Sequence, residues 1–265
     1  MPMKEFLSVI RDHKYYKVFM TGEKPVIVFD DHRFVVPILW LARKTGMIDE
    51  NINMVRFDGH LDALDFQKDI LGEFRAVDSF EAMFRFCEKK LKIEDDDWLS
   101  FVLHERIIKN VLTFCDRSDA INPAYADRMF RINRFDGILA HQGEFSQTPI
   151  LKNHQELWDL VGWSKFGIND APVLLDIDCD YFTYQWRGEP YPWTDEFYKI
   201  EFSNGPSLTA GFSNRSFIDK IIERSPFVTI CLEPDFCGGK ESAWKILEKL
   251  AHCMFDGLLL TGKSG

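Results

Sequence analysis

The chain has 265 residues, 46% of them hydrophobic, which is enough for one α/β domain to bury a full core, and we expect residues 1–265 to form a single domain. Its net charge of −10 argues against a nucleic-acid partner and suits a cationic substrate. The sequence has no apolar run of about 18 residues and no apolar signal segment at its N-terminus, so we expect a cytoplasmic protein without a membrane partner, whose oligomeric state stays open.

Four short apolar runs predict buried strands, at residues 26–29, 52–57, 172–177 and 227–232. The spacing of apolar residues predicts helices at residues 35–45, 80–91, 99–115, 155–163, 217–224 and 241–254. Because strands and helices alternate, we expect an α/β fold of three αβα layers with a mostly parallel sheet. Residues 181–206 are rich in aromatic residues and too irregular for a helix, and they predict a long ordered loop beside the sheet.

All six cysteines stand outside CxxC pairs, so the sequence contains neither a zinc framework nor a disulfide pattern. We therefore expect reduced thiols, most of them buried.

Each predicted strand ends in a charged motif: DDH at 30–32, DGHLD at 58–62, DIDCD at 176–180 and EPD at 233–235. The carboxyl ends of parallel strands meet at one edge of a sheet, where open α/β sheets bind their ligands. Because side chains alternate in direction along an extended chain, the charged residues of DGHLD would point the same way, and so would those of DIDCD. We therefore expect two rows of charged side chains in one crevice, formed by Asp58, His60 and Asp62 and by Asp176, Asp178 and Asp180.

Such a crevice needs positive charge. Two carboxylates about 4 Å apart repel by roughly 4 kcal/mol at an effective dielectric constant of about 20, and burying each one unpaired costs several kcal/mol more. Arg33 and Arg56 are the nearby cations in the sequence, and we expect Arg56 to pair with only one acid. Oxygen and imidazole ligands without thiolate suit Mn²⁺, and also Fe²⁺, Co²⁺ or Zn²⁺. The sequence therefore predicts bound divalent metal, with Mn²⁺ as the first choice.

The order of these motifs resembles the ureohydrolase superfamily of arginase and agmatinase. It is most similar to the divergent branch of peptide arginases, which share an FDDH start and an LDxDxD[YF]F block. The resemblance spans residues 29–235 but rests on four short motifs. It implies an arginase/deacetylase-like fold, a pair of metal ions and a glutamate, Glu233, that receives the guanidinium group. It further implies that His32, Asp58, Asp62 and Asp176 hold one metal and His60 and Asp178 the other, with Asp58 and Asp176 bridging.

The chain departs from the arginase pattern at two motifs. Arginases usually have GGDH where this chain has FDDH at 29–32, and DxDxxDP where it has DIDCDY at 176–181. The second departure leaves the register open, so that Asp178 with Asp180 can replace Asp176 with Asp178 as ligands. The histidine that shuttles protons in the family has no clear match. His104 is one candidate and His141 another, although the helical setting of His104 favours a core or surface histidine.

The resemblance implies hydrolysis of arginine, in a peptide or protein, to ornithine and urea. Two metals about 3.5 to 4 Å apart would supply hydroxide at neutral pH, Glu233 would orient the guanidinium, and Asp62 would pass a proton to the leaving amine. The aromatic stretch at 181–206 is larger than a free amino acid requires and favours a peptide substrate.

Three other functions stay open. One is a hydrolase of the same fold that acts on another C–N bond, in agmatine, a formimino group or an acetylated amine. A second is a metal-dependent phosphoesterase, against which the shortage of Arg and Lys near the strand ends speaks. The third is a non-catalytic metal-binding module.

Overall fold

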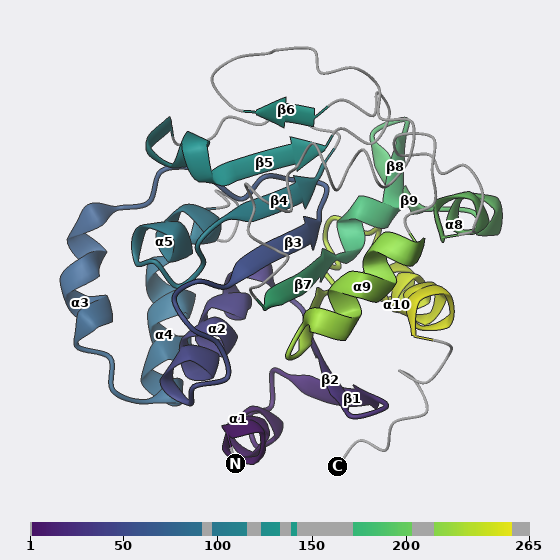
Figure 1. Cartoon of the computed structure of the whole chain (residues 1–265). Helices are drawn as coiled ribbons and strands as arrows, with labels where there is room; N and C mark the ends of the chain where they lie inside the picture. Colours follow the sequence, from purple (N-terminus) through teal and green to yellow (C-terminus); the bar gives the residue numbers. More distant parts are fainter. Residues whose placement is uncertain are drawn as a thin grey trace.

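The computed structural model describes residues 2–91, 97–115, 123–132, 139–141, 172–202 and 215–255. These residues build an eight-stranded sheet in the order β1-β2-β10-β7-β3-β4-β5-β6, which crosses the centre of Figure 1. The six inner strands are parallel, and they are β2, β10, β7, β3, β4 and β5. The edge strands β1 and β6 pair antiparallel with their neighbours. The strands are β1 Lys17–Thr21, β2 Lys24–Phe29, β3 Asn53–Phe57, β4 Val111–Phe114, β5 Met129–Ile132, β6 Leu139–His141, β7 Val173–Asp178 and β10 Val228–Cys231.

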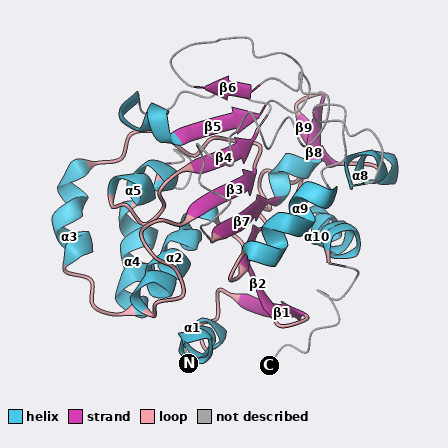
Figure 2. Cartoon of the chain, in the orientation of Figure 1, coloured by secondary structure: helices cyan, strands magenta, loops and turns pink. Residues whose placement is uncertain are grey.

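Helices cover both faces of the sheet, so the expected three-layer αβα fold is confirmed (Figure 2). Each face has its own hydrophobic core. The first core contains side chains from α1 Pro2–Arg11, α2 Val35–Lys44, α3 Leu71–Arg75, α4 Phe80–Lys90 and α5 Trp98–His104. The second core contains side chains from α8 Asp195–Phe202, α9 Arg215–Arg224 and α10 Lys240–Met254.

Alternation along the central strands decides which residues face which core. In β3, Met54 packs into the first core, whereas Val55 and Phe57 pack into the second. Because successive side chains of a strand point to opposite faces, Arg56 lies on the same face as Met54. Asp176 in β7 is the register partner of Arg56, so both charged residues lie beneath α2, α4 and α5.

The four predicted strands are confirmed to within two residues, and so are four of the helices, α2, α4, α9 and α10. The predicted helix at residues 155–163 lies outside the described residues. The cysteines in the described part of the chain are free, and five of the six are buried, as expected. Within the described ranges, no helix combines the length and the apolar character that crossing a membrane requires.

The helix predicted over residues 99–115 is wrong. The structure has α5 at Trp98–His104 and then strand β4 at Val111–Phe114. Arg106 between them has a left-handed backbone with φ of 53°, which ends the helix. The short apolar run VLTF fits a buried strand as well as a helix, and pairing with β3 and β5 decides the matter.

The loop predicted over residues 181–206 is also wrong in its described part, which ends at residue 202. It contains a hairpin of strands β8 Thr183–Trp186 and β9 Glu189–Pro192, followed by helix α8. Arg187 and Gly188 form the hairpin turn with φ of 54° and 85°, the left-handed values that two-residue hairpin turns require. Helix α1 and strand β1, which the sequence pattern did not predict, precede β2.

Candidate metal centre

His32 lies at the centre of a group of buried carboxylates at the carboxyl edge of the sheet. Its Nε2 atom is 2.9 Å from Asp176 Oδ2. Its Nδ1 atom is 2.8 Å from Asp178, 3.1 Å from Asp62 and 3.3 Å from Asp58, in each case from Oδ2. The side chains of all five residues are buried. The prediction that the motifs DDH, DGHLD and DIDCD bring side chains together is therefore confirmed.

Local structure after β2 fixes the position of His32. Asp31 accepts a hydrogen bond from the Arg33 backbone N–H at 3.2 Å and caps a short 3₁₀ helix over His32–Phe34. That turn directs the imidazole of His32 back across the end of the sheet. Arg33 points away from the aspartates around His32, because its guanidinium pairs with Asp31 at 3.1 Å and donates to the backbone carbonyl of Leu91 at 3.1 Å.

A second group forms around His60. Its Nδ1 atom lies 2.8 Å from Asp180 Oδ2, and the Gly59 N–H donates to Asp180 Oδ1 at 2.8 Å. A Cβ atom on Gly59 would overlap the Asp180 carboxylate, so this close approach favours glycine. The His60 N–H donates to Asp58 Oδ1 at 2.6 Å. Asp58 therefore lies between the two groups, with Oδ2 facing His32 and Oδ1 facing His60.

The expected alternation of Asp58, His60 and Asp62 is wrong. Asp58 and Asp62 both face His32, whereas His60 faces Asp180. The reason is that β3 ends at Phe57 and the chain does not stay extended, with Asp62 at a left-handed φ of 50°. In the DIDCD motif, likewise, the chain leaves the strand after Asp178 and enters a 3₁₀ helix over Cys179–Phe182.

The expectation that Arg56 pairs with one acid is also wrong, because it contacts three. Its Nη2 atom donates to both Asp58 and Asp62, and its Nε atom lies 3.4 Å from Asp176 Oδ2. The Trp98 ring lies beneath the guanidinium, 4.7 Å from Cζ to the ring centroid. The turn at Asp62 and the register of β3 against β7 bring the second and third acids to Arg56. Arg56 is 0% exposed.

Glu233 follows β10 and brings a further carboxylate to His32. Its backbone has a φ of 36°, a strained value for a residue with a side chain, and such strain is concentrated at functional sites. Ligand atoms of Glu233, His32, Asp178 and Cys231 all lie within 4.8 Å of one another. No Lys or Arg among the described residues forms an ion pair with Glu233. Burial and the nearby Asp178 raise the pKa of Glu233 well above its usual value.

The pKa values divide the aspartates into two sets. Burial raises the pKa of Asp178 to about 7, with a further contribution from Asp180, and burial also raises the pKa of Asp58 well above its usual value. Burial acts in the same direction on Asp62 and Asp176, but Arg56 and His32 outweigh it and hold both pKa values below the usual range. Desolvation would lower the pKa of His32, but Asp176 and Asp178 raise it well above 6.5.

The cluster fits metal ions. An imidazole nitrogen donates at most one hydrogen, yet three carboxylate oxygens lie within 3.3 Å of His32 Nδ1. In addition, Asp178 Oδ2 is buried without a hydrogen-bond partner in the structure. A divalent cation among these atoms would satisfy them together. His32 with Asp58, Asp62, Asp176 and Asp178 could therefore hold metal ions, and this donor set does not distinguish Mn²⁺ from Fe²⁺, Co²⁺ or Zn²⁺.

Neither candidate for the proton shuttle is brought to the cluster by the described contacts. His104 Nδ1 lies 2.9 Å from the Tyr125 hydroxyl, and its ring packs edge-on against Phe66. Trp98, which touches Asp62, begins α5 and His104 ends it, so the two are separated by about 9 Å along the helix axis. His141 ends the edge strand β6, and its side chain lies outside what the structure describes.

Sequence reasoning missed three residues of the site. Trp98 donates to Asp62 Oδ2 at 2.9 Å, and Thr229 donates to Asp176 Oδ1 at 2.6 Å. Cys231 brings its thiol near Glu233 and His32. Thr229 and Cys231 precede Glu233 by four and two residues, so the alternation of side chains along a strand could have placed them on the side of Glu233. Trp98 comes from a helix, and no pattern in the sequence links it to the cluster.

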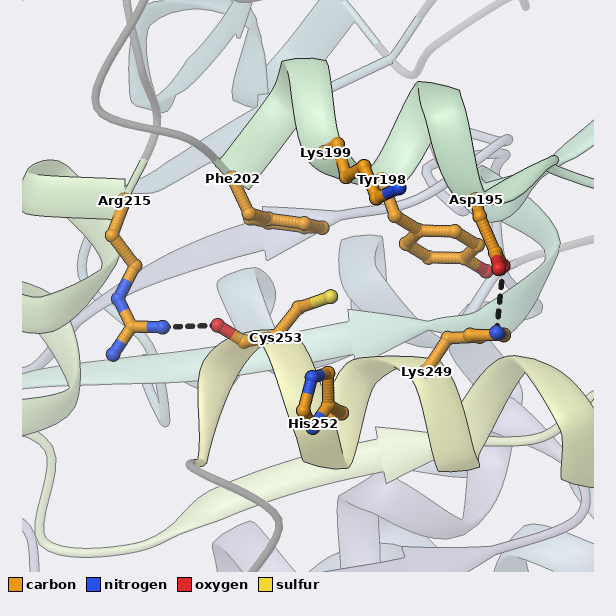
Figure 3. Close-up of a pocket in the computed structure, with 8 residues that line it drawn as sticks. All are labelled: Asp195, Tyr198, Lys199, Phe202, Arg215, Lys249, His252 and Cys253. Carbon is orange, nitrogen blue, oxygen red and sulfur yellow. Dashed lines mark hydrogen bonds and ion pairs between the residues drawn. The ribbon is translucent and has the colours of Figure 1, made fainter.

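A cavity of about 490 Å³ lies elsewhere, between α8, α9 and α10 (Figure 3). Basic side chains surround it, and Lys249 pairs with Asp195 at 2.6 Å. None of these three helices supplies a residue to the Asp/His cluster. The cavity is lined by Asp195, Tyr198, Lys199, Phe202, Arg215, Lys249, His252 and Cys253.

Comparison with known proteins does not add a family. Neither a scan against protein-family models nor a search of curated proteins found a match for this chain. The resemblance to ureohydrolases is therefore a prediction from the motifs alone.

Proposed function

We propose that this chain is a binuclear metal-dependent hydrolase of the ureohydrolase type, which converts arginine in a peptide or protein to ornithine and urea. The observation that carries the proposal is the position of Asp58. It belongs to two groups of possible metal ligands, a buried one with His32 and Asp62 and a partly exposed one with His60 and Asp180. A carboxylate shared by two such groups is suited to bridge two divalent ions, of which Mn²⁺ is our first choice.

Bound there, the two ions would lower the pKa of a shared water and supply hydroxide at neutral pH. The contacts favour Asp178 and Asp180 over Asp176 as the ligands from the DIDCD motif. Asp176 already accepts a hydrogen bond from Thr229 and contacts His32 and Arg56, whereas Asp178 Oδ2 lies near His32 without forming a hydrogen bond. Asp62 suits the role of a ligand better than that of a proton carrier, because Arg56 keeps its carboxylate ionised.

Glu233 supports a guanidinium substrate. Its carboxyl group is largely desolvated and forms no ion pair with a described Lys or Arg, so an incoming cation would stabilise its ionised form and be bound by it. Glu233 and His60 are partly exposed, unlike the aspartates of the cluster, so a substrate would approach from their side. The exposed ring of Phe236 stands at this opening, 5.1 Å from the His60 ring.

The hairpin β8–β9 supports a substrate longer than free arginine. A Cβ atom on Gly238 would lie 2.7 Å from the Pro190 carbonyl oxygen, so the hairpin packs against the turn that follows Glu233. Tyr184, Trp186 and Tyr191 of the hairpin are 40%, 59% and 43% exposed. Exposed aromatic rings on a hairpin that packs against the turn after Glu233 suit contacts with the residues that flank an arginine in a peptide.

Glu233→Gln tests the proposal, with Asp235→Asn as the matched control. Asp235 is an exposed acid two residues further on, so its variant removes the same charge outside the cluster. A charge-assisted contact is worth about 1.5 to 3 kcal/mol, so urea release from an arginine peptide should fall about tenfold to 150-fold in Glu233→Gln. The control should keep full activity, and both variants should keep the metal content of the wild type.

Two results would contradict the role of Glu233, namely full urea release by Glu233→Gln or loss of its metal. A wild-type protein that binds Mn²⁺ but releases no urea from any arginine-containing peptide would contradict the reaction itself. Assays with agmatine, formimino and acetylated-amine substrates would then separate another C–N hydrolase of this fold from a non-catalytic metal-binding module.

A further inference from the structure

Arg56 holds a permanent positive charge inside a cluster that is otherwise suited to metal ions. Its side chain is fully buried, on the face of β3 that packs into the first core. It donates a hydrogen bond to the Leu61 carbonyl at 3.2 Å and lies over the Trp98 ring. These contacts fix the guanidinium from below, and an arginine cannot lose its charge by releasing a proton.

The oxygens that Arg56 contacts are the ones that face His32. Nη2 binds Oδ2 of Asp58 and Oδ2 of Asp62, and the same two atoms lie 3.3 and 3.1 Å from His32 Nδ1. A divalent ion held by His32, Asp58 and Asp62 would share these ligand oxygens with a guanidinium. Positive charges at such separations repel strongly, which would weaken metal binding at this position.

The group around His60 meets less of this competition, because Arg56 contacts only one of its members, Asp58. Asp58 turns its other oxygen, Oδ1, toward His60, and Asp180 is held by Gly59 and His60. Arg56 forms no ion pair with Asp180 within the described part of the chain. The two candidate positions therefore differ in a respect that the sequence motifs do not reveal. Arg56 contacts two of the three ligands at His32, Asp58 and Asp62, but at the His60 position it contacts only Asp58, through the oxygen that faces His32.

We propose that Arg56 is a built-in cation that takes over part of the role of one metal ion. It balances Asp58, Asp62 and Asp176, so that the protein folds without metal. It also makes the metal positions unequal, with tight binding at Asp58, His60 and Asp180 and weak binding at His32, Asp58 and Asp62. This inference rests on the metal centre of the proposed function but not on the reaction.

The test compares chelator-treated wild type with Arg56→Met, Arg56→Lys and the control Arg33→Met. Arg33 is a buried arginine of the same neighbourhood that pairs with Asp31 and hydrogen-bonds to the Leu91 carbonyl, and neither contact involves the carboxylates around His32. Metal-free Arg56→Met should melt roughly 6 to 20 °C below the wild type, because it leaves buried carboxylates without their counter-ion. Arg56→Lys should retain more of the Tm, since it keeps the charge.

Mn²⁺ should raise the Tm of Arg56→Met more than that of the wild type, whereas Arg33→Met should respond to Mn²⁺ as the wild type does. Calorimetric titration of the wild type with Mn²⁺ should find one tight position and one weaker by at least about tenfold, and Arg56→Met should tighten the weak one. Asp180→Asn, which keeps Arg56, should lose the tight position, and this measurement holds even where Arg56→Met does not fold.

Equal metal-free Tm values for Arg56→Met and wild type would overturn the inference, as would two positions of equal affinity in the wild type. Tight Mn²⁺ binding that survives in Asp180→Asn would overturn it too. The inference about Arg56 and the proposed reaction can fail separately. A protein that has these unequal metal positions but releases no urea would support the inference and contradict the proposed hydrolase.

Discussion

Asp176 and Asp178 lie two residues apart on the same face of β7, but their surroundings differ. Asp176 accepts a hydrogen bond from Thr229 at 2.6 Å, and it contacts Arg56 and His32, which lower its pKa against the effect of burial. Asp178 Oδ2 also lies 2.8 Å from His32, but it forms no hydrogen bond, and Asp178 has no ion pair with Arg56 in the described part of the chain, so burial raises its pKa to about 7. The protein's own groups therefore satisfy the carboxylate of Asp176, whereas the carboxylate of Asp178 is left to be satisfied by a ligand.

The largest expected difference is in the stability of the metal-free protein. Asp176→Asn breaks a buried charge network and should lower the free energy of unfolding by about 3 to 5 kcal/mol. Asp178→Asn should not lower it at pH 8, because it removes a carboxylate that burial and Asp180 disfavour in its charged form. Urea unfolding of the two variants without metal measures the difference, and equal losses would contradict it.

Metal binding should reverse the ranking of these two aspartates. At about 100 times its dissociation constant, Mn²⁺ should stabilise the wild type by roughly 2.7 kcal/mol, provided that the unfolded chain does not bind it. Asp178→Asn should lose most of this gain, and Thr229→Val, which alters only the surroundings of Asp176, should keep it. A Mn²⁺ titration followed by thermal unfolding would refute the comparison if Asp178→Asn responded as the wild type does.

The pH dependence of stability provides a smaller effect. The pKa of Asp178 rises from 3.8 to about 7 on folding, so the folded protein binds more protons between about pH 4 and 7, and its stability falls as the pH rises. From pH 6 to 8 the loss is about 1.4 kcal/mol from Asp178. His32 acts in the same direction, because its raised pKa stabilises the fold below pH 6.5 and this contribution is lost as the pH rises through the folded-state pKa.

Asp62 and Asp176 do not oppose this trend between pH 6 and 8, because their lowered pKa values affect stability only in more acidic solution. Asp178→Asn should remove the share of Asp178, and saturating Mn²⁺ should flatten the dependence by displacing the proton. A metal-free stability that rises between pH 6 and 8 would contradict the assignment.

The sequence predicted which acidic motifs meet in the cluster better than it predicted the contacts of Arg56. Strand ends with acidic motifs correctly predicted that His32, Asp58 and Asp178 would meet, because parallel strands end at one edge of the sheet. The prediction that Arg56 pairs with one acid rested on its position in β3 alone. Its contact with Asp176 depends on the register of β3 against β7, two segments that are distant in the sequence. In the segment that brings Asp62 to Arg56, Gly59 marks a turn, but the left-handed residue is Asp62 itself, and no local pattern predicted that conformation.

The fold shows the same division between local and distant information. Apolar runs predicted the central strands, which bury both faces. The apolar spacing predicted one helix across β4, because the run VLTF, three apolar residues and a threonine, fits a helix as well as a strand, and the pairing partners of β4 lie more than ten residues away in the sequence. The hairpin β8–β9 was taken for loop because its strands are short and mostly exposed, so no alternation of apolar and polar residues marks them.

The smallest expected effect lies outside the cluster, at the cavity of Figure 3, and it tests whether burial or distance decides the strength of a charged contact. Lys249 Nζ lies 2.6 Å from Asp195, closer than the 2.8 Å between His32 and Asp178. Both Lys249 and Asp195 are exposed, however, so water and salt screen their attraction. Lys249→Met should therefore leave the Tm unchanged within error at 0.15 M salt, roughly the physiological ionic strength. A loss comparable to that of Asp176→Asn would mean that distance outweighs burial, and the contrast between Asp176 and Asp178 would then need another explanation.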